Sequence, residues 1–260
     1  MSSEVVLVRR DADIATVVLN RPEKLNALTK PMWRRIGEVM RELSADGAVR
    51  CVVVRGAGDK AFAPGNDIAE FTTTRTNAEQ ARDYGKIHLP SLAAVRACRH
   101  PTVALIKGIC VGGGFEVAAA CDLRICGASS RFGIPIARLG LAAGYEEIQT
   151  LLGIAGRAGV LELLLEGRVL GADEALQKGL VTRVVADEEV EAEAYATARR
   201  IADGAPLVAR WHKKFVLRLD DPRPLTPAEL DEAYQSYDTE DFQTGYRSFL
   251  EKTKPTFKGR

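Results

Sequence analysis

The chain of 260 residues is poor in the side chains that bind metals. It contains three histidines (His88, His100 and His212) and five cysteines, and no two cysteines form a CxxC pair. A structural zinc site needs such ligands at short characteristic spacings, so we expect no bound metal. An odd number of scattered cysteines is typical of reduced, buried thiols. We therefore expect a cytoplasmic protein.

The chain also lacks an excess of charge of either sign. Thirty-six lysines and arginines nearly balance thirty-five aspartates and glutamates, which gives a formal net charge of +1. This balance does not favour nucleic acid or an anionic membrane as a partner. Met1-Ser2-Ser3-Glu4 lacks the basic start and long apolar stretch of a signal peptide, and we expect no membrane span. With 46% hydrophobic residues, the chain has enough apolar side chains for a substantial core.

Several common catalytic and nucleotide-binding motifs are absent. There is no GxxxxGK[ST] phosphate loop and no GxSxG nucleophile turn, and the three glycines Gly112-Gly113-Gly114 do not extend to GxGxxG. These absences argue against a P-loop nucleotide hydrolase, a serine hydrolase of the α/β-hydrolase type and a dinucleotide-binding protein. We expect no cofactor.

What is present indicates an α/β protein. Short β-branched runs recur, and between the second and the third of them a segment with apolar residues at helical spacing (31–43) predicts an amphipathic crossover helix. This alternation is typical of an α/β fold. The predicted strands are Val5 to Val8, Ala15 to Leu19, Cys51 to Val54, Thr102 to Ile109, Leu123 to Cys126 and Val181 to Val185.

Helical patterns dominate after about residue 140. They cover residues 148–153, 159–165, 172–178 and 188–202, and Thr226-Pro227-Ala228-Glu229 carries the cap, proline and glutamate that start a further helix. The two prolines within 220–224 indicate a linker before it. We predict a core over residues 1–200 and a helical oligomerisation region over 201–260.

The last helical region is unusually rich in apolar and aromatic residues. Such a stripe is either a core face of its own or a contact with another subunit. Both readings remain open from the sequence. The residues are Leu230, Ala233, Tyr234, Tyr237, Phe242, Tyr246, Phe249 and Leu250.

The three consecutive glycines lie between a strand-like run and an apolar helix-like run that opens with Phe115 and Glu116. Glycines permit positive φ and close approach of another group, and the unpaired N–H groups at a helix start attract an anion or a developing oxyanion. Glu116 at this position is a candidate base. An ordinary tight turn with a glutamate that complements the helix dipole explains the local pattern equally well.

A second turn rich in glycine, residues 56–68, follows the predicted strand Cys51 to Val54. It exposes backbone N–H groups around Gly65 to Ile68. Two such turns after neighbouring strands could direct two N–H groups at one oxygen. Taken alone, this loop has the pattern of a plain surface turn.

Taken together, these segments closely resemble the crotonase, or enoyl-CoA hydratase/isomerase, superfamily. The resemblance covers nearly the whole chain, with separate motifs in the family's order. They are Leu19-Asn20-Arg21-Pro22-Glu23-Lys24-Leu25-Asn26-Ala27-Leu28, the segment 60–68, the segment 108–116, Ala120-Cys121-Asp122-Leu123-Arg124, Arg131-Phe132-Gly133, Leu139-Gly140-Leu141, Gly179-Leu180-Val181 and the tail 249–258.

The resemblance implies a spiral core of ββα units, a helical C-terminal region that builds a homotrimer or a hexamer of two trimers, and a role in fatty acid metabolism. The substrate would be an acyl-CoA thioester, so coenzyme A arrives as part of the substrate. By motif position, the backbone N–H groups of Asn66 and Gly113 would form the oxyanion hole. Other implied substrate contacts are Lys24, Leu25, Ala61, Ala63, Gly65, Asp67, Ile68 and Gly112, with Phe257 and Lys258 reaching a neighbouring subunit's ligand.

The chain departs from the family at the second catalytic position. Hydratases of the family use two glutamates on one water, and the first matches Glu116, but the second falls at Ile136. Isoleucine neither carries a proton nor holds a water. We hypothesise that Glu146 or Tyr145, in a turn that is commonly glycine-rich in the family, supplies the missing group. The alternative is that Glu146 and Glu147 are solvated first-turn residues of the next helix.

The function expected from the resemblance is that of an enoyl-CoA hydratase with Glu116 as principal base. An enoyl-CoA isomerase that uses one carboxylate and a non-catalytic acyl-CoA-binding subunit are the alternatives. The family's variable acyl pocket would fall within residues 71–90. Arg138 would meet a carboxylate on the acyl group or form a surface salt bridge.

Overall fold

A computed structural model describes residues 4–260. Two sheets form its centre, and the larger has the order β1-β2-β3-β5-β7-β10, parallel except for the β1-β2 hairpin. The smaller has the order β4-β6-β8-β9. The strands are β1 (Val6–Asp11), β2 (Ile14–Leu19), β3 (Cys51–Gly56), β4 (Ala61–Ala63), β5 (Thr102–Ile106), β6 (Ile109–Val111), β7 (Leu123–Gly127), β8 (Arg131–Gly133), β9 (Leu170–Gly171) and β10 (Arg183–Val185).

Three ββα units repeat along the chain. In each unit the first strand joins the larger sheet, the second joins the smaller sheet, and helices follow. The units are β3-β4 with α2 (Phe71–Thr74) and α3 (Ala78–Arg96), β5-β6 with α4 (Gly113–Ala120), and β7-β8 with α5 (Tyr145–Glu166). The α/β core expected from the resemblance is confirmed.

The run predicted as one strand over 102–109 is two strands that belong to different sheets. They separate at Gly108, whose φ is +63° and where a Cβ would lie 2.1 Å from the carbonyl oxygen of Lys60. Only glycine allows that approach. The short strands β4, β8 and β9 were not predicted, because two or three residues give no readable alternation.

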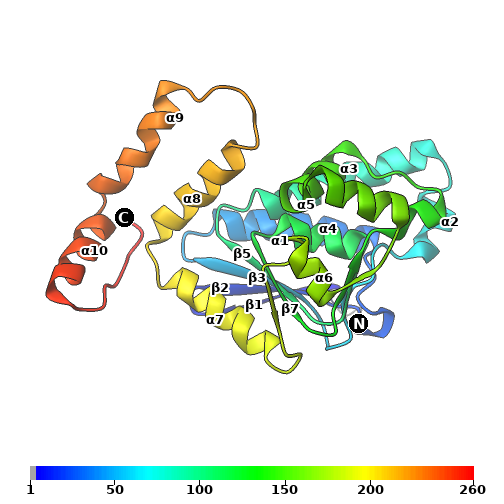
Figure 1. The fold of residues 1–260 in the computed structure, drawn as a ribbon, viewed down its shortest axis with the longest axis horizontal. Coiled ribbons are helices and arrows are strands. Elements are labelled where there is room, and N and C mark those ends of the chain that lie inside the picture. Colours follow the sequence, from blue (N-terminus) through cyan, green and yellow to red (C-terminus); the bar gives the residue numbers. More distant parts are fainter. Residues whose placement is uncertain (1–3) are drawn as a thin grey trace.

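Helices cover both faces of the larger sheet (Figure 1). On one face, α1 (Lys30–Ala45) packs against α3, and a Cβ at Gly37 would lie 2.6 Å from the Ser91 hydroxyl oxygen, so the two helices cross closely. On the other face, α7 (Val190–Ala202) lays Val190 and its alanines over β3, β5 and β7. Helix α1 confirms the helix that was predicted over residues 31–43.

Helix α3 was missed because its inward face is partly polar. It buries Tyr84, His88, Ser91, Leu92 and Val95. These positions have helical spacing, but a histidine and a serine interrupt the apolar stripe. A polar inward face of this kind indicates a site rather than a plain core.

The chain after α7 is helical and extends away from the core (Figure 1). It contains α8 (Pro206–Arg218), α9 (Pro227–Glu232) and α10 (Glu240–Glu251), while the small helix α6 (Ala172–Gln177) lies earlier. Helix α9 begins with the predicted capping box, in which the side chains of Thr226 and Glu229 each accept from the other's backbone N–H. The helical character of this region is confirmed. The boundary at residue 200 stays a prediction.

The aromatic stripe of the last region is not a core face within this chain. Phe249 is 83% exposed and Leu250 is 73% exposed, and Tyr234 and Tyr237 are also exposed. The reading of a self-contained core is therefore wrong. Contact with another subunit stays a prediction.

Helix α5 is long and apolar enough to cross a membrane by length and composition alone. Gly156, with φ +61° and ψ 176°, interrupts it. Each half is thus much shorter than the ~20 residues that a spanning helix needs. All five cysteines are free and buried, as expected from the sequence.

Candidate active site

The two glycine-rich turns meet above the ends of β4 and β6. Gly65 has φ +115° and Gly112 has φ +53°, and a Cβ at Gly112 would lie 3.5 Å from the Gly65 Cα. A Cβ at Gly65 would lie 3.6 Å from the backbone nitrogen of Gly113. The positive φ values, which favour glycine, hold the two turns in contact.

Two backbone N–H groups at this junction are left without a partner by the local structure. Gly113 is the first residue of α4, where an N–H has no intrahelical acceptor. Asn66 bridges to Leu28, but that bridge uses the N–H groups of Leu28 and Asp67. Asn66 and Gly113 line the same cavity of about 330 Å³. The structure thus brings together the two donors that the sequence pointed to.

Residues of the segment 19–28 hold the loop that carries Asn66 in place. The buried Asn26 has φ +65°, and its Nδ2 donates to the carbonyl oxygens of Ala57 at 3.0 Å and Ala61 at 2.9 Å. Asp67 forms an ion pair with Arg21 at 3.0 Å. These contacts anchor both ends of the turn, so its backbone donors are held in place.

Glu116 lies in the first turn of α4 and is only 4% exposed. Its Oε2 is 3.2 Å from Nε2 of His88, which α3 directs into the same site. The His88 ring packs on Trp33, with ring centroids 4.3 Å apart. When Glu116 is ionised it only accepts hydrogen bonds, so we assign the proton of this contact to Nε2.

A second carboxylate faces the other side of the same imidazole. Oε1 of Glu147 is 3.6 Å from Nδ1 of His88, longer than a direct hydrogen bond. Glu147 is the third residue of α5, and its side chain accepts from the backbone N–H of Gly144. That contact folds the side chain back over the helix start and toward the cavity.

The surroundings of Glu147 favour its protonated form. Burial raises the pKa of its carboxyl, and the nearby charge of Glu116 raises it further. The Gly144 N–H, His88 and Arg75 oppose this shift without cancelling it. A carboxyl whose raised pKa favours its acid form is suited to act as a general acid.

His88, Glu116 and Glu147 each place a possible ligand atom within 4.8 Å of the others. A single ion would need one imidazole nitrogen to face both carboxylates. His88 instead turns Nε2 to Glu116 and Nδ1 to Glu147. The cluster is therefore arranged as two carboxylates bridged by an imidazole rather than as a set of metal ligands.

The predicted site residues separate into two groups. Those that line the cavity are Gly65, Asn66, Ile68, Gly112, Gly113, Glu116 and Ile136. Those that do not line it are Lys24, Leu25, Ala61, Ala63, Asp67, Tyr145, Glu146, Phe257 and Lys258. In the C-terminal tail, the N–H of Lys258 donates to Asp241 at 2.6 Å, and the carbonyl oxygen of Phe257 accepts from Arg50 at 2.6 Å.

The structure places Glu147, not Glu146 or Tyr145, opposite Glu116. Tyr145 is 92% exposed, and Glu146 lines a different cavity beside Leu89. Adjacent helix positions point in different directions, so only one of the two glutamates can face inward. The sequence did contain a signal for the orientation of Glu147. It stands three residues after Gly144, and from that position a glutamate side chain reaches back to the backbone N–H at the helix cap.

Comparisons with known proteins identify the family of the chain. The family model described as enoyl-CoA hydratase/isomerase matches residues 9–260. The chain belongs to this family. It is 32% identical to the crotonyl-CoA hydratase of Syntrophomonas wolfei, over 99% of each protein, and 31% identical to the short-chain-enoyl-CoA hydratase of Clostridium acetobutylicum, over 98% of each.

Solved structures of the enoyl-CoA hydratase/isomerase family share the fold. An enoyl-CoA hydratase/carnithine racemase from Magnetospirillum magneticum is 50% identical, with a TM-score of 0.97 over 100% of this chain and 97% of that one. The enoyl-CoA hydratase from Bacillus anthracis is 29% identical, with a TM-score of 0.90 over 99% and 100%. The crotonase fold is thus shown along the full length.

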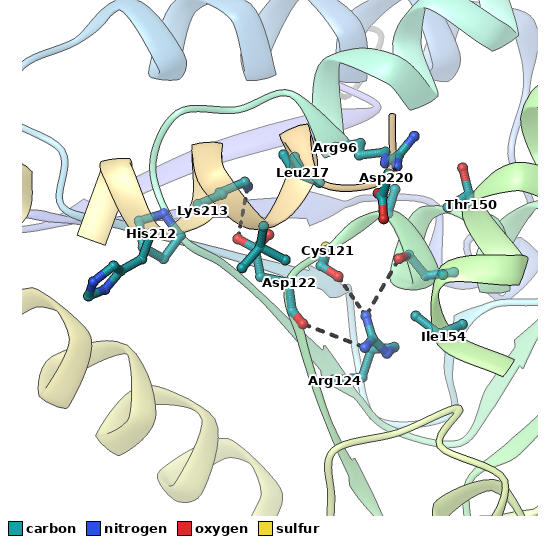
Figure 2. A pocket seen from close by; sticks show the side chains of 15 residues that line it. Arg96, Cys121, Asp122, Arg124, Thr150, Ile154, His212, Lys213, Leu217 and Asp220 are labelled. Atoms are coloured by element: carbon teal, nitrogen blue, oxygen red, sulfur yellow. Dashed lines mark hydrogen bonds and ion pairs between the residues drawn. The ribbon is translucent and has the colours of Figure 1, made fainter. Parts of the chain in front are cut away.

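A separate cavity of about 390 Å³ lies between the end of α4 and α8 (Figure 2). Its charged groups are paired with each other or with the backbone. Lys213 is 2.8 Å from Asp122, Arg96 is 2.5 Å from Asp220, and Arg124 donates to the carbonyl oxygen of Cys121 at 2.6 Å. Apart from His212, the ionisable side chains that line this cavity are therefore engaged in ion pairs or backbone contacts.

Proposed function

We propose that this member of the enoyl-CoA hydratase/isomerase family adds water across the double bond of a 2-enoyl-CoA thioester. The observation that carries the proposal is Glu147, which places a second carboxylate opposite Glu116. The position of the family's second glutamate is occupied by Ile136, which cannot transfer a proton. Ile136 and Glu147 line the same cavity. Hydration needs one group to activate water and one to deliver a proton, and the cavity contains both.

The thioester carbonyl binds the backbone N–H groups of Asn66 and Gly113. These two donors point at the oxygen that gains negative charge when the enolate forms. Removing one donor of this kind typically costs about 2.7 to 4 kcal/mol of transition-state stabilisation. The start of α4 adds the positive end of its dipole.

The two carboxylates divide the proton transfers between them. Glu116 takes a proton from water as the water oxygen bonds to C3 and the C2–C3 double bond shifts electrons toward the carbonyl. Glu147, whose raised pKa favours the acid form, then gives its proton to C2. One proton is taken and one is given, so the product is the 3-hydroxyacyl thioester, and both carboxyls recover by exchange with solvent.

His88 acts on this reaction by positioning. Its Nε2–H donates to Glu116 at 3.2 Å, which fixes the direction of that carboxylate. The ring is buried and packs on Trp33, so it cannot swing away. The same imidazole separates the two carboxylates and limits their repulsion.

The test compares neighbouring glutamates with crotonyl-CoA as substrate. Glu147→Gln should lower kcat by ~100-fold or more, the range for loss of a general acid, with a small change in KM. The matched variant Glu146→Gln, outside the cavity, should keep kcat within about twofold, since exposed substitutions away from a site have small effects. Full turnover by Glu147→Gln would contradict the proposal. Loss of turnover in Glu146→Gln would instead favour Glu146 as the group that replaces the family's second glutamate.

The product mass distinguishes the alternatives. Hydration adds one water to crotonyl-CoA, whereas isomerisation of a 3-enoyl-CoA to the 2-enoyl form changes no mass. Conversion of the 3-enoyl substrate without hydration would identify an isomerase. Binding of acyl-CoA without turnover of either substrate, and unaffected by Glu116→Gln, would identify a non-catalytic subunit.

We also propose that the exposed aromatic stripe is covered by further copies of this chain in a homotrimer. Phe249, Leu250 and Tyr234 expose a large apolar surface on helices that extend from the core. Light scattering with size-exclusion chromatography should give three times or six times the mass of the chain. A monomeric mass would contradict this proposal.

A further inference from the structure

Arg75 lies between α2 and α3 and lines the same cavity as Glu116 and Glu147. It is half-buried. Its guanidinium carbon lies 3.6 Å from the centre of the Tyr84 ring and 5.1 Å from that of Phe71. Stacking on two aromatic rings fixes the plane of the guanidinium and leaves the N–H groups at its edge available to the cavity.

Among residues 4–260, no carboxylate forms an ion pair with this guanidinium. In the same described part of the chain, the Arg75 side chain also forms no hydrogen bond. The charge of Arg75 nevertheless acts on the site, because it lowers the pKa of Glu147. Burial and the charge of Glu116 raise that pKa. A guanidinium whose N–H groups have no protein partner is available to an anionic ligand.

Arg75 lies close to the proposed oxyanion hole. The Tyr84 ring beneath it carries a hydroxyl 3.4 Å from Oδ1 of Asn66, beside the proposed oxyanion hole. The remaining wall is formed by apolar side chains such as Phe71, Leu139 and Leu141. A guanidinium here faces the end of a short acyl chain, whereas the phosphates of coenzyme A are separated from the thioester by the whole pantetheine arm.

Arg138 lines the same cavity from the segment after β8. It is exposed, and within residues 4–260 it forms no ion pair either. The surface salt bridge that the sequence left open is therefore not formed in the described part of the chain. Arg138 provides a second cation at the rim of the cavity.

We propose that the preferred substrate is an acyl-CoA whose acyl chain ends in a carboxylate, a monothioester of an unsaturated dicarboxylic acid, held by Arg75 with Arg138 at the rim. The planar guanidinium matches a carboxylate through two parallel hydrogen bonds. A purely hydrocarbon chain would remove water from Arg75 and return no partner. This substrate class rests on the function proposed above.

The test uses two thioesters of equal chain length, pent-2-enoyl-CoA and 4-carboxybut-2-enoyl-CoA. The protein should prefer the carboxylated substrate by about 10- to 100-fold in kcat/KM, the range for a charge-assisted pair. In Arg75→Met this ratio should fall toward one, and Arg138→Met should reduce it less. Arg82→Met is the matched control, because Arg82 is an exposed arginine on α3 that does not line the cavity; it should keep the full preference.

Calorimetric binding of free CoA, pentanoyl-CoA and 4-carboxybutanoyl-CoA separates this inference from catalysis. Tighter binding of the carboxylated analogue that depends on Arg75 supports the subsite even if neither substrate is turned over, in which case only the hydration proposal fails. Equal affinity for the two acyl analogues overturns the subsite. Equal weakening of all three ligands in Arg75→Met also overturns it, because the guanidinium would then serve the coenzyme phosphates.

Discussion

The indole N–H of Trp33 donates a hydrogen bond of 2.7 Å to Oδ1 of Asn66. Trp33 is fully buried in the second turn of α1, and Asn66 provides one of the two backbone donors of the site. The contact therefore connects the crossover helix to the loop after β4. The same indole packs on His88, so one buried side chain supports both the proposed oxyanion hole and the group that holds Glu116.

Trp33→Phe tests this connection. The loss of one buried hydrogen bond typically costs about 0.5 to 1.5 kcal/mol, and a loop that is free to shift weakens a hydrogen bond made in the transition state. We expect kcat to fall about tenfold while KM changes less. Steady-state kinetics with crotonyl-CoA measure this. Trp211→Phe, on α8 and away from the cavity, is the control, and equal losses in both variants would contradict a specific role for Trp33.

The raised pKa of Glu147 predicts opposite effects of Glu147→Gln on stability and on activity. Below the ordinary pKa of a glutamate, Glu147 is protonated in both folded and unfolded chains. As the pH rises through the ordinary and then the raised pKa, the unfolded chain loses its proton first, so the folded state loses stability. Glu147→Gln should therefore have a higher Tm than the parent protein at pH 8, and this difference should disappear at low pH.

The pH dependence of kcat/KM should also report the protonation of Glu147. In the parent protein kcat/KM should decline at high pH as Glu147 loses its proton. The decline at high pH should be absent from the residual activity of Glu147→Gln. Thermal melts and pH profiles of Glu146→Gln should match the parent. A lower Tm at pH 8 for Glu147→Gln would refute the raised pKa of this carboxyl.

Ile136→Glu tests whether Glu147 replaces the family's second glutamate. In the parent protein a third carboxylate in the cavity should lower stability, because it adds repulsion with Glu116 and Glu147. In the Glu147→Gln background, the same substitution should restore crotonyl-CoA hydration at least tenfold over Glu147→Gln alone, a large part of a general acid's contribution. If the double variant is no faster than Glu147→Gln, Glu147 does not act in that position.

His100 predicts a loss of stability in acid. It is fully buried, and burial, followed by the charges of Arg210 and Arg99, lowers its pKa to about 4. Above pH 6.5 the imidazole is neutral in both states. As the pH falls from there to 4, the unfolded chain binds the proton first, so the free energy of unfolding should fall by up to about 3 kcal/mol. His100→Gln should flatten this part of the curve in urea titrations, and the exposed His212→Gln should not.

Much of the fold and half of the site could be predicted from local patterns. Glycines with forced positive φ at residues 65 and 112 identified the two turns, and Glu116 follows the second directly. Helix α9 was predicted to begin at its capping box. Such features depend on neighbours along the chain, and they remain readable whatever the rest of the protein does.

The other half of the site depended on groups brought from distant segments. His88 comes from α3, which was missed because a histidine and a serine interrupt its buried face. Glu147 was considered only as a solvated residue beside Glu146, since the choice between adjacent helix positions depends on where the helix packs. Arg75 had no distinguishing pattern, because its significance is the absence of a partner in three dimensions.

The sequence alone determined the family, the turns that hold two backbone donors, and the gap at Ile136, because each depends on residue identity at a fixed spacing. The tertiary structure decided which carboxylate lies opposite Glu116, which imidazole lies between the two, and which arginine stacks beside the cavity. These depend on the crossing of α1 and α3 and on the direction in which α5 begins. Packing of distant segments sets those directions, and no local pattern encodes them.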